Sequence, residues 1–424
     1  MSLEGSAGGG RSQARAAWRA VVLLAALLTA AGWGPAPAAA AEVVPGENLC
    51  AAINALEPGQ ELLVHPGDYE GPCTIRRGGR PGAPIVVRAS EPERRPRIVY
   101  AGSSANVIDV KADHVTLRGL AFGPTAHDVD GVRVFARAGI TITECEFSGL
   151  GGIAIAVNHV SINGLTVTRN VVQNSGATGM YFGCQEGVEC VVSGLLVEGN
   201  FIQHVNAPDP EIGYGLQIKL NSTGIVRNNI ILDTKGPGIM IYGAREAINR
   251  SLLERNVVVG SRTSSGIVVA GGPATVRNNI LVQNREAGIG LEDYRGRGLL
   301  RSIAVVHNSL YRNAAGGISL PEGGRLRDVT IVNNAVHARG GTRAIPGPRP
   351  EIELAGNVDC TWAPCFVDPE GMDFSPLIGS LLSAPGSGRA GVWVPVDDYA
   401  GHRRNMPPTV GAVEGRARPI RLNP

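Results

Sequence analysis

The central part of the chain repeats one short phrase, in which an asparagine precedes a pair of mostly apolar residues. The repeated asparagines are Asn170, Asn200, Asn228, Asn256, Asn278, Asn308 and Asn334. Successive members lie roughly 22 to 30 residues apart, a period that is typical of solenoids built from stacked coils. A glycine and an apolar residue follow after a polar loop, as at Gly215-Leu216 and Gly238-Ile239. A unit of this length and pattern has room for short strands and turns but not for a regular helix.

These repeats predict an all-β fold, a right-handed parallel β-helix of about nine coils, over residues 106–340. Residues 42–105 should form an N-terminal cap and the first coils, with one short helix near Asn48–Leu56 that covers the open end. Residues 341–424 should form a C-terminal cap and a tail, because the repeat fades after His337 and prolines follow. The 58 glycines and the low aromatic content also favour tight turns and stacked aliphatic strands over a helical core.

The repeated asparagines should lie in register at one corner of the coils, where each can bond its own turn and the asparagine of the next coil. We therefore interpret them as a structural ladder. Cys145 occupies the same position in an earlier coil, which predicts a buried, inert thiol. Arginines precede four of these positions, at Arg169, Arg227, Arg255 and Arg277. Because stacked like charges repel, this column is either a solvated or internally paired face or a track for an acidic polymer.

The first 41 residues have the pattern of a secretory signal peptide. An arginine-containing start precedes the apolar run Val21–Leu28, and Ala39–Ala41 offers small residues for cleavage. The apolar run is shorter than the roughly 20 residues that span a bilayer, and no later segment is apolar enough to do so. We expect a secreted or periplasmic monomer without stable membrane insertion. The net charge of +2 gives no indication of nucleic-acid binding.

Seven cysteines in an exported chain are compatible with disulfides. Their positions favour the pairs Cys50–Cys73, Cys184–Cys190 and Cys360–Cys365, which leaves Cys145 free. The first pair brackets the first folded segment, and each of the other two closes a short loop.

Two predicted strands near the middle of the repeat carry the candidate catalytic residues. Both alternate apolar and polar residues, so Ile218 and Ile241 should face the core while Lys219 and Tyr242 face outward. If the strands pair, Lys219 and Tyr242 lie side by side about 5 Å apart, and an amine beside a phenol can exchange protons. The candidate substrate-binding residues are Tyr181, Gln217, Tyr214, Lys235, Arg245, Glu292 and His204. Small residues flank this outward wall, which predicts a groove for a long polymer.

A long polar loop, residues 203–211, leads into the strand of Lys219. Asp209 and Glu211 in this loop could hold a hard cation such as Ca²⁺ through carboxylate oxygens. A plain solvated loop, with no ligand, is the alternative.

The segment Gly215-Leu216-Gln217-Ile218-Lys219, followed by Met240-Ile241-Tyr242-Gly243, resembles a strand pair in the β-helical polysaccharide lyases of the chondroitinase B and alginate lyase type. In that family a lysine on one coil is the base and an arginine on the next is its acid partner. Lys219 matches the lysine, whereas Tyr242 stands where the family has arginine. The family's calcium-binding acidic residues have only Glu211 as a counterpart. The resemblance covers the repeat region as architecture and implies an anionic polysaccharide as substrate.

We therefore predict eliminative cleavage of a uronic-acid-containing polysaccharide, with Lys219 as the base and Tyr242 as the acid. Lys235 or Arg245 should lower the pKa of Lys219. The substrate carboxylate should meet Gln217, Arg245 or a loop-bound cation.

Two other functions remain open on the same scaffold. A glycoside hydrolase needs two carboxylates that face one groove, and Glu292 and Asp293 are the nearest candidates. As neighbours in a strand they should point to opposite faces. A secreted carbohydrate-binding or surface-coat protein needs no catalytic pair, and the fold is compatible with either.

Overall fold

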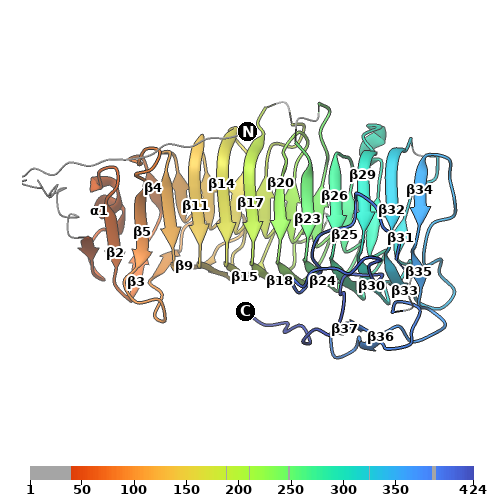
Figure 1. Ribbon diagram of the computed structural model, residues 1–424. Coiled ribbons are helices and arrows are strands. Elements are labelled where there is room, and N and C mark those ends of the chain that lie inside the picture. The colour runs from red at the N-terminus through yellow and green to blue at the C-terminus, as the bar shows by residue number, and fades with distance from the viewer. Residues whose placement is uncertain (1–39, 188, 210, 247–248, 324, 384–387) are drawn as a thin grey trace, which may run out of the picture. The chain divides into compact units, whose positions relative to one another are not determined.

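The computed structural model describes residues 40–187, 189–209, 211–246, 249–323, 325–383 and 388–424. These residues form a solenoid in which most coils contribute one strand, in turn, to each of three parallel sheets, A, B and C (Figure 1). The predicted signal segment lies outside the described residues except for its last two positions.

Sheet A contains β1 (Ala41–Val43), β2 (Glu61–Val64), β5 (Ile85–Ala89), β8 (Val115–Arg118), β11 (Ala138–Thr143), β14 (Ile162–Thr168), β17 (Val192–Glu198), β20 (Gly224–Arg227), β23 (Ser251–Glu254), β26 (Ala274–Arg277), β29 (Arg301–Val306), β32 (Arg327–Val332) and β34 (Ile352–Ala355). Sheet B contains β3 (Asp68–Glu70), β6 (Arg97–Tyr100), β9 (Ala121–Thr125), β12 (Glu146–Ser148), β15 (Val171–Ser175), β18 (Phe201–Val205), β21 (Ile230–Thr234), β24 (Val257–Val259), β27 (Ile280–Val282), β30 (Ser309–Tyr311), β33 (Ala335–His337) and β35 (Val358–Asp359). Sheet C contains β4 (Cys73–Ile75), β7 (Ile108–Val110), β10 (Val132–Val134), β13 (Ile155–Val157), β16 (Met180–Phe182), β19 (Leu216–Ile218), β22 (Ile239–Ile241), β25 (Ile267–Val269), β28 (Ile289–Leu291) and β31 (Ile318–Ser319).

The predicted parallel β-helix is therefore confirmed, and it is longer than the expected nine or so coils. Sheet A has thirteen strands among the described residues. The additional coils begin in the N-terminal section, where β2 to β4 already form one full coil. No asparagine phrase marks these early coils in the sequence, so the repeat alone understates their number.

Aliphatic side chains of the same position stack on one another through the core. In sheet C one such row is Leu216, Ile239, Ile267 and Ile289, and a second is Ile218, Ile241, Val269 and Leu291. All eight are at most 1% exposed. Burial of each such side chain contributes about 1.5–3 kcal/mol, so these rows hold successive coils at a fixed register.

The asparagine ladder is present at the turn between sheets A and B. Its members are Asn170, Asn200, Asn229, Asn256, Asn279, Asn308, Asn334 and Asn357. At each step the Oδ1 atom of one asparagine accepts hydrogen bonds from the backbone N–H and the side-chain Nδ2 of the asparagine one coil earlier, as Asn256 does from Asn229 at 3.2 and 2.9 Å. The ladder thus satisfies buried backbone groups that a turn would otherwise leave unpaired.

The prediction was wrong by one residue at two positions of the ladder, where it named Asn228 and Asn278. Both have a left-handed backbone, with φ of 56° and 55°. The neighbouring Asn229 and Asn279 occupy the ladder instead. Asparagine tolerates the left-handed region better than most residues, so in an Asn-Asn pair either residue fits the corner by sequence alone.

The column of arginines beside the ladder is internally paired. Arg169 pairs with Glu144, Arg227 with Glu198, Arg255 with Asp397 and Arg277 with Glu254. The first of the two sequence interpretations is therefore correct, and this column offers no unbalanced charge to a polymer. Cys145 caps the ladder as predicted: its backbone N–H donates to Asn170 Oδ1, and burial raises the pKa of its thiol to about 12.

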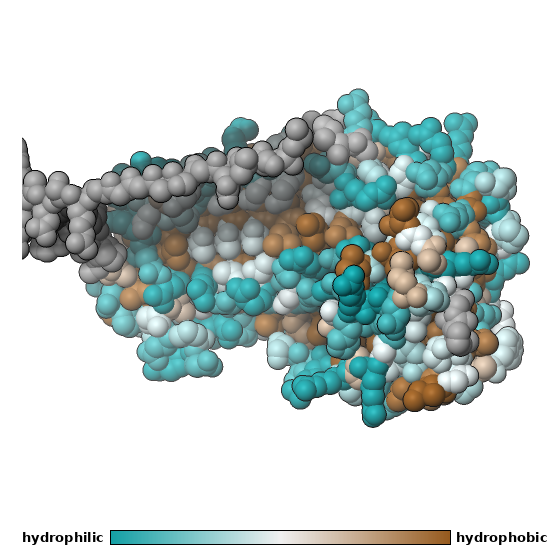
Figure 2. All heavy atoms as spheres, in the orientation of Figure 1, coloured by the Kyte–Doolittle hydropathy of each residue, from teal (hydrophilic) through white to brown (hydrophobic). Residues whose placement is uncertain are grey.

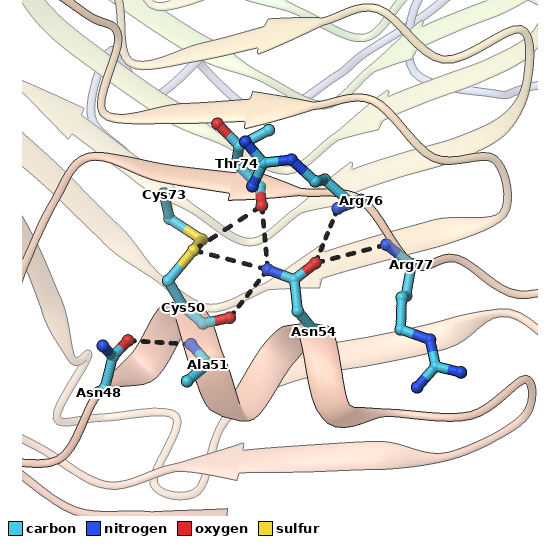
Figure 3. The surroundings of a disulfide bond; sticks show 8 residues. All are labelled: Asn48, Cys50, Ala51, Asn54, Cys73, Thr74, Arg76 and Arg77. Carbon is cyan, nitrogen blue, oxygen red and sulfur yellow. Dashed lines mark hydrogen bonds between the residues drawn. A yellow bond between two sulfur atoms is a disulfide. The ribbon is translucent and has the colours of Figure 1, made fainter.

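A short helix and a disulfide cover the N-terminal end. Helix α1 (Leu49–Ala55) begins after Asn48, whose side chain accepts a hydrogen bond from the Ala51 N–H (Figure 3). The Cys50–Cys73 disulfide joins α1 to β4, and Asn54 Nδ2 donates to Thr74 O beside it (Figure 3). The other two predicted disulfides, Cys184–Cys190 and Cys360–Cys365, are also present.

The C-terminal segment packs along the last coils. It contains the antiparallel pair β36 (Phe366–Asp368) and β37 (Asp373–Pro376). Arg404 is buried there, where it pairs with Glu414 and donates to Asn278 Oδ1. This contact explains why Asn278 is buried although it lies outside the ladder. No helix among the described residues is long and apolar enough to cross a membrane.

The outward face of sheet A is largely uncharged along its middle. One outward row, in register, is Thr116, Thr141, Thr166, Leu196, Ile225, Leu252 and Thr275. Figure 2 shows a band of neutral and hydrophobic side chains along this face, with hydrophilic side chains gathered at its rims. Threonine and β-branched residues favour a pleated, half-buried surface.

We expect the substitution Asn256→Ala to lower the free energy of unfolding by about 2–4 kcal/mol, because it removes the acceptor of two donors of Asn229 inside the structure. Urea unfolding followed by circular dichroism measures the change. The matched control is Asn228→Gly, since Asn228 is exposed, bonds only Glu198 through its side chain and has a backbone that glycine adopts freely. An equal loss in both variants would contradict a ladder at Asn229.

Candidate functional site

Lys219 and Tyr242 lie side by side on adjacent coils. The register of β16, β19 and β22 aligns Phe182, Ile218 and Ile241, and the pairing continues beyond the strands: the Lys219 N–H donates to Phe182 O and the Tyr242 N–H to Ile218 O. The Lys219 Nζ atom lies 4.3 Å from the centre of the Tyr242 ring. The predicted neighbourhood of amine and phenol is therefore present.

Both side chains are buried, which the alternation of residues did not predict. Lys219 is 3% exposed and Tyr242 is 2% exposed. They point away from the core of the coils, but a second apolar cluster covers them. This outer cluster contains Tyr214, Leu220, Met240, Tyr242, Val268, Ala270 and Leu299, with Tyr294 packed against it. The segment around η1 (Tyr294–Gly296) thus covers this outward-facing surface of sheet C.

The environment of Lys219 favours its neutral form. Burial, followed by the nearby positive charges of Arg297 and Arg295, lowers the pKa of Lys219 to about 8. The sequence-based choice of Lys235 and Arg245 for this role was wrong. Lys235 instead forms an ion pair with Asp209. Arg245 is exposed, with its backbone N–H bonded to Asn221.

Aromatic rings surround the amine on several sides. The Lys219 Nζ atom also lies 4.9 Å from the centre of the Tyr181 ring, and Tyr294 contacts Tyr242 edge to face, with 5.0 Å between ring centres. The hydroxyls of Tyr214 and Tyr242 are 3.2 Å apart. Burial raises the pKa of Tyr214, raises that of Tyr181 to about 12 and raises that of Tyr242 well above its usual range. All three phenols therefore stay protonated near neutral pH.

The loop closed by the Cys184–Cys190 disulfide contacts both the Lys219 amine and the segment around η1 that covers it. Gln185 Oε1 accepts a hydrogen bond from Lys219 Nζ at 3.1 Å. Glu186 pairs with Arg295 at 2.9 Å and with Arg297 at 3.0 Å. Sequence reasoning missed all four of these residues. The available signal was the position of Cys184, two residues after the end of β16, which places the disulfide loop at the same edge of sheet C as Lys219.

These side chains line a cavity of about 350 Å³. The predicted residues that line it are Tyr181, Tyr214, Gln217, Lys219, Tyr242 and Glu211. Gln185 and Tyr294 line it as well. Gln217 is 2% exposed, and its Oε1 atom has no hydrogen-bond partner among the described residues. A buried acceptor without a hydrogen-bond partner lowers the stability of the folded protein. Gln217 Oε1 is therefore available to accept a hydrogen bond from a ligand in the cavity.

The other predicted residues lie outside this cavity. His204 pairs with Asp233 at a neighbouring turn. Glu292 follows the row of Lys219, Tyr242 and Ala270 on a later coil, and burial raises the pKa of its carboxyl. Asp293 accepts a hydrogen bond from the Gly298 N–H, so it supports the loop and does not form a carboxylate pair with Glu292.

The two predicted calcium ligands meet at a lysine. Lys235 Nζ forms an ion pair with Asp209 and donates a hydrogen bond to the Glu211 backbone carbonyl at 2.6 Å, and Glu211 also lines the cavity. Within the described ranges, no group of three or more acidic, histidine or cysteine side chains is arranged to hold a metal ion. The described residues therefore give no support for the predicted site, because Ca²⁺ binds through several oxygen ligands.

Comparison with known proteins supports the right-handed parallel β-helix. A family model described as "Right handed beta helix region" matches residues 130–298. The structure is similar to XylC in complex with xylose, with a TM-score of 0.55 at 10% identity, over 87% of this chain and 95% of that one. Pectate lyase Pel9A gives a TM-score of 0.48 at 14% identity, over 89% and 96% of the two chains. The catalytic unit of a GH87 α-1,3-glucanase from Streptomyces thermodiastaticus gives 0.49 at 16% identity, over 76% and 69%. No curated protein matches the sequence.

The lowered pKa of Lys219 predicts a pH-dependent stability. Between about pH 8 and about pH 10.5 the unfolded chain binds the proton of Lys219 more tightly than the folded chain, so folding becomes more favourable as the pH rises. Relative to a Lys219→Met variant, the wild-type protein should gain on the order of 2 kcal/mol between about pH 7 and pH 10.

Urea unfolding at a series of pH values measures this difference. The chain has two other lysines, Lys111 and Lys235. Lys111 provides the control, because it is exposed and also lies over an aromatic ring, 5.3 Å from the centre of Phe135. Lys111→Met is the matched substitution at this exposed lysine, and its stability curve serves as the reference for the Lys219→Met comparison. Parallel stability curves for wild type and Lys219→Met would contradict the lowered pKa.

Proposed function

We propose that the chain is an exported polysaccharide lyase that cleaves a uronic-acid-containing polymer by β-elimination in the cavity around Lys219. The observation that carries the proposal is a buried amine with a pKa lowered to about 8, set against phenols that stay protonated. This arrangement supplies a base and a proton donor in one cavity, which is what elimination requires.

Lys219 acts as the base in this proposal. With a pKa of about 8, a substantial fraction of the amine is neutral at mildly alkaline pH. The neutral amine removes the proton from the sugar carbon that bears the carboxylate. The electron pair of that C–H bond forms a carbon–carbon double bond as the bond to the glycosidic oxygen breaks.

Tyr242 supplies the proton to the departing oxygen. Its phenol is protonated, and Tyr214 lies within hydrogen-bond distance of its hydroxyl. A bare buried phenolate would be costly. The ammonium formed on Lys219 lies beside this ring, so it stabilises the phenolate and then returns the proton. The net result is transfer of one proton from the sugar carbon to the leaving oxygen, with both residues restored.

The cavity also has groups suited to hold an acidic sugar. Gln217 Oε1 can accept a hydrogen bond from a sugar hydroxyl, and the rings of Tyr181 and Tyr294 provide apolar surface. Arg295 is about half exposed beside the cavity and can meet the substrate carboxylate. The positive charge of Arg295 and Arg297 also opposes protonation of Lys219. The same arginines therefore attract the substrate carboxylate and keep the base neutral.

The described lining favours elimination over hydrolysis. A glycoside hydrolase needs two carboxylates that face the scissile bond, and Glu211 is the single carboxylate among the described residues that line this cavity. The three disulfides fit an oxidising compartment, which agrees with the proposed export.

The substitution Lys219→Met should abolish formation of unsaturated products from acidic polysaccharides, because it removes the base and leaves the packing similar. Ultraviolet absorbance of the new double bond measures the reaction across a panel of uronic-acid polymers. Lys111→Met should retain wild-type activity, since Lys111 lies on a distant coil. Products with saturated reducing ends would indicate hydrolysis, and binding without cleavage of the whole panel would indicate a binding protein. Either result would overturn the proposal.

The substitution Tyr242→Phe should lower kcat by about 10²–10⁴-fold while the protein remains folded, because it removes the proton donor and keeps the ring. In the wild-type protein kcat/KM should rise with pH through about 8, as Lys219 loses its proton. The corresponding control is Tyr100→Phe, at an exposed hydroxyl that bonds only Ser104. A pH profile that is flat between about pH 7 and pH 9 would argue against Lys219 as the base.

A further inference from the structure

A second cavity, of about 750 Å³, lies at the turns that follow sheet B on the later coils. It lies after the ends of β24, β27, β30 and β33, on coils beyond those of β16, β19 and β22 that carry the Lys219 cavity. Its lining includes four arginines, one from each turn: Arg262, Arg285, Arg312 and Arg339. We call this site the arginine groove.

The arginine groove carries positive charge that the described residues leave partly unbalanced. Arg262 pairs with Asp233, and Arg312 pairs with Glu370. Arg285 and Arg339 are exposed and form no ion pair within the described part of the chain. The contrast with the arginines beside the asparagine ladder is informative, because there each of the four has an acidic partner. Unbalanced arginines in a concave site attract anions.

Side-chain hydrogen bonds connect three of the four turns that present these arginines. Asn284 is buried, and its Nδ2 atom donates to Asn313 Oδ1 at 2.8 Å while its Oδ1 atom accepts from the Ser261 N–H. This short second ladder fixes the turns from which Arg262 and Arg285 project. Arg285 and Arg339 belong to turns two coils apart, which corresponds to about 10 Å along the helix axis. The spacing suits an extended ligand that carries repeated negative charges.

We propose that the arginine groove binds an acidic polysaccharide along the helix axis, with carboxylate or sulfate groups of the sugar on Arg285 and Arg339. The exposed Gln283 side chain on the same surface can bond sugar hydroxyls. A nucleic acid fits less well, because single strands are held by stacking of bases on aromatic rings. The one ring in the described lining, that of His337, already packs against Tyr311.

This inference concerns binding alone and does not depend on catalysis at Lys219. The test compares Arg285→Gln/Arg339→Gln with Arg325→Gln/Arg327→Gln. The control pair removes the same charge from exposed arginines near the start of β32 in sheet A, and their side chains have no ion pair within the described ranges. Fluorescence anisotropy at low salt would use labelled oligogalacturonate, a heparin-derived oligosaccharide, neutral dextran and oligo-dT. Urea unfolding would establish that each variant is folded.

The wild-type protein should bind the carboxylated or the sulfated sugar and not dextran, and added salt should weaken the binding. The Arg285→Gln/Arg339→Gln variant should bind about fivefold or more weakly, whereas the control pair should bind like wild type. The preferred acidic sugar would identify the anionic group. Equal weakening by the control pair, unchanged binding by the groove variant, no binding of either acidic sugar, or equal binding of oligo-dT would overturn the proposal.

Discussion

The stacking of coils at a constant register is the constraint on which the structure depends. Each coil lies about 4.8 Å from the next, and the buried asparagines hydrogen-bond across every step from Asn170 to Asn357. The aliphatic rows of the core hold the same register from inside. As a result, residues that are 23 positions apart in the chain, such as Lys219 and Tyr242, become lateral neighbours whose separation is set by the fold.

The repeat in the sequence was sufficient to predict this architecture, and it failed where two residues satisfy the same requirement. Asn228 and Asn229 could each occupy the ladder, and only the left-handed backbone of Asn228 decides between them. The neighbourhood of Lys219 and Tyr242 followed from simple alternation in two strands. The burial of these two side chains did not follow from the alternation, because Tyr294 and Leu299, which cover them, come from a segment outside the repeated phrases. A periodic pattern describes the coils and gives no information on what folds over them.

Burial changes the chemistry that the sequence suggested. An exposed lysine would be a cation at neutral pH, with no special reactivity. Inside the covered cavity, burial lowers the pKa of the same amine to about 8, and nearby positive charges contribute. These charges belong to Arg297 and Arg295 and not to Lys235 and Arg245, which the sequence suggested. The acidic partner of these arginines, Glu186, lies in a disulfide loop more than 100 residues away.

That pairing has a consequence for how the solenoid unfolds. In a stack of coils each unit contacts mainly its nearest neighbours, so stability propagates locally and segments can melt independently. Glu186 follows β16, whereas Arg295 and Arg297 follow β28, and the coils of β19, β22 and β25 lie between them. Opening of these coils also breaks the Glu186 ion pairs, which span the whole group and add a small coupling between coils that are not nearest neighbours.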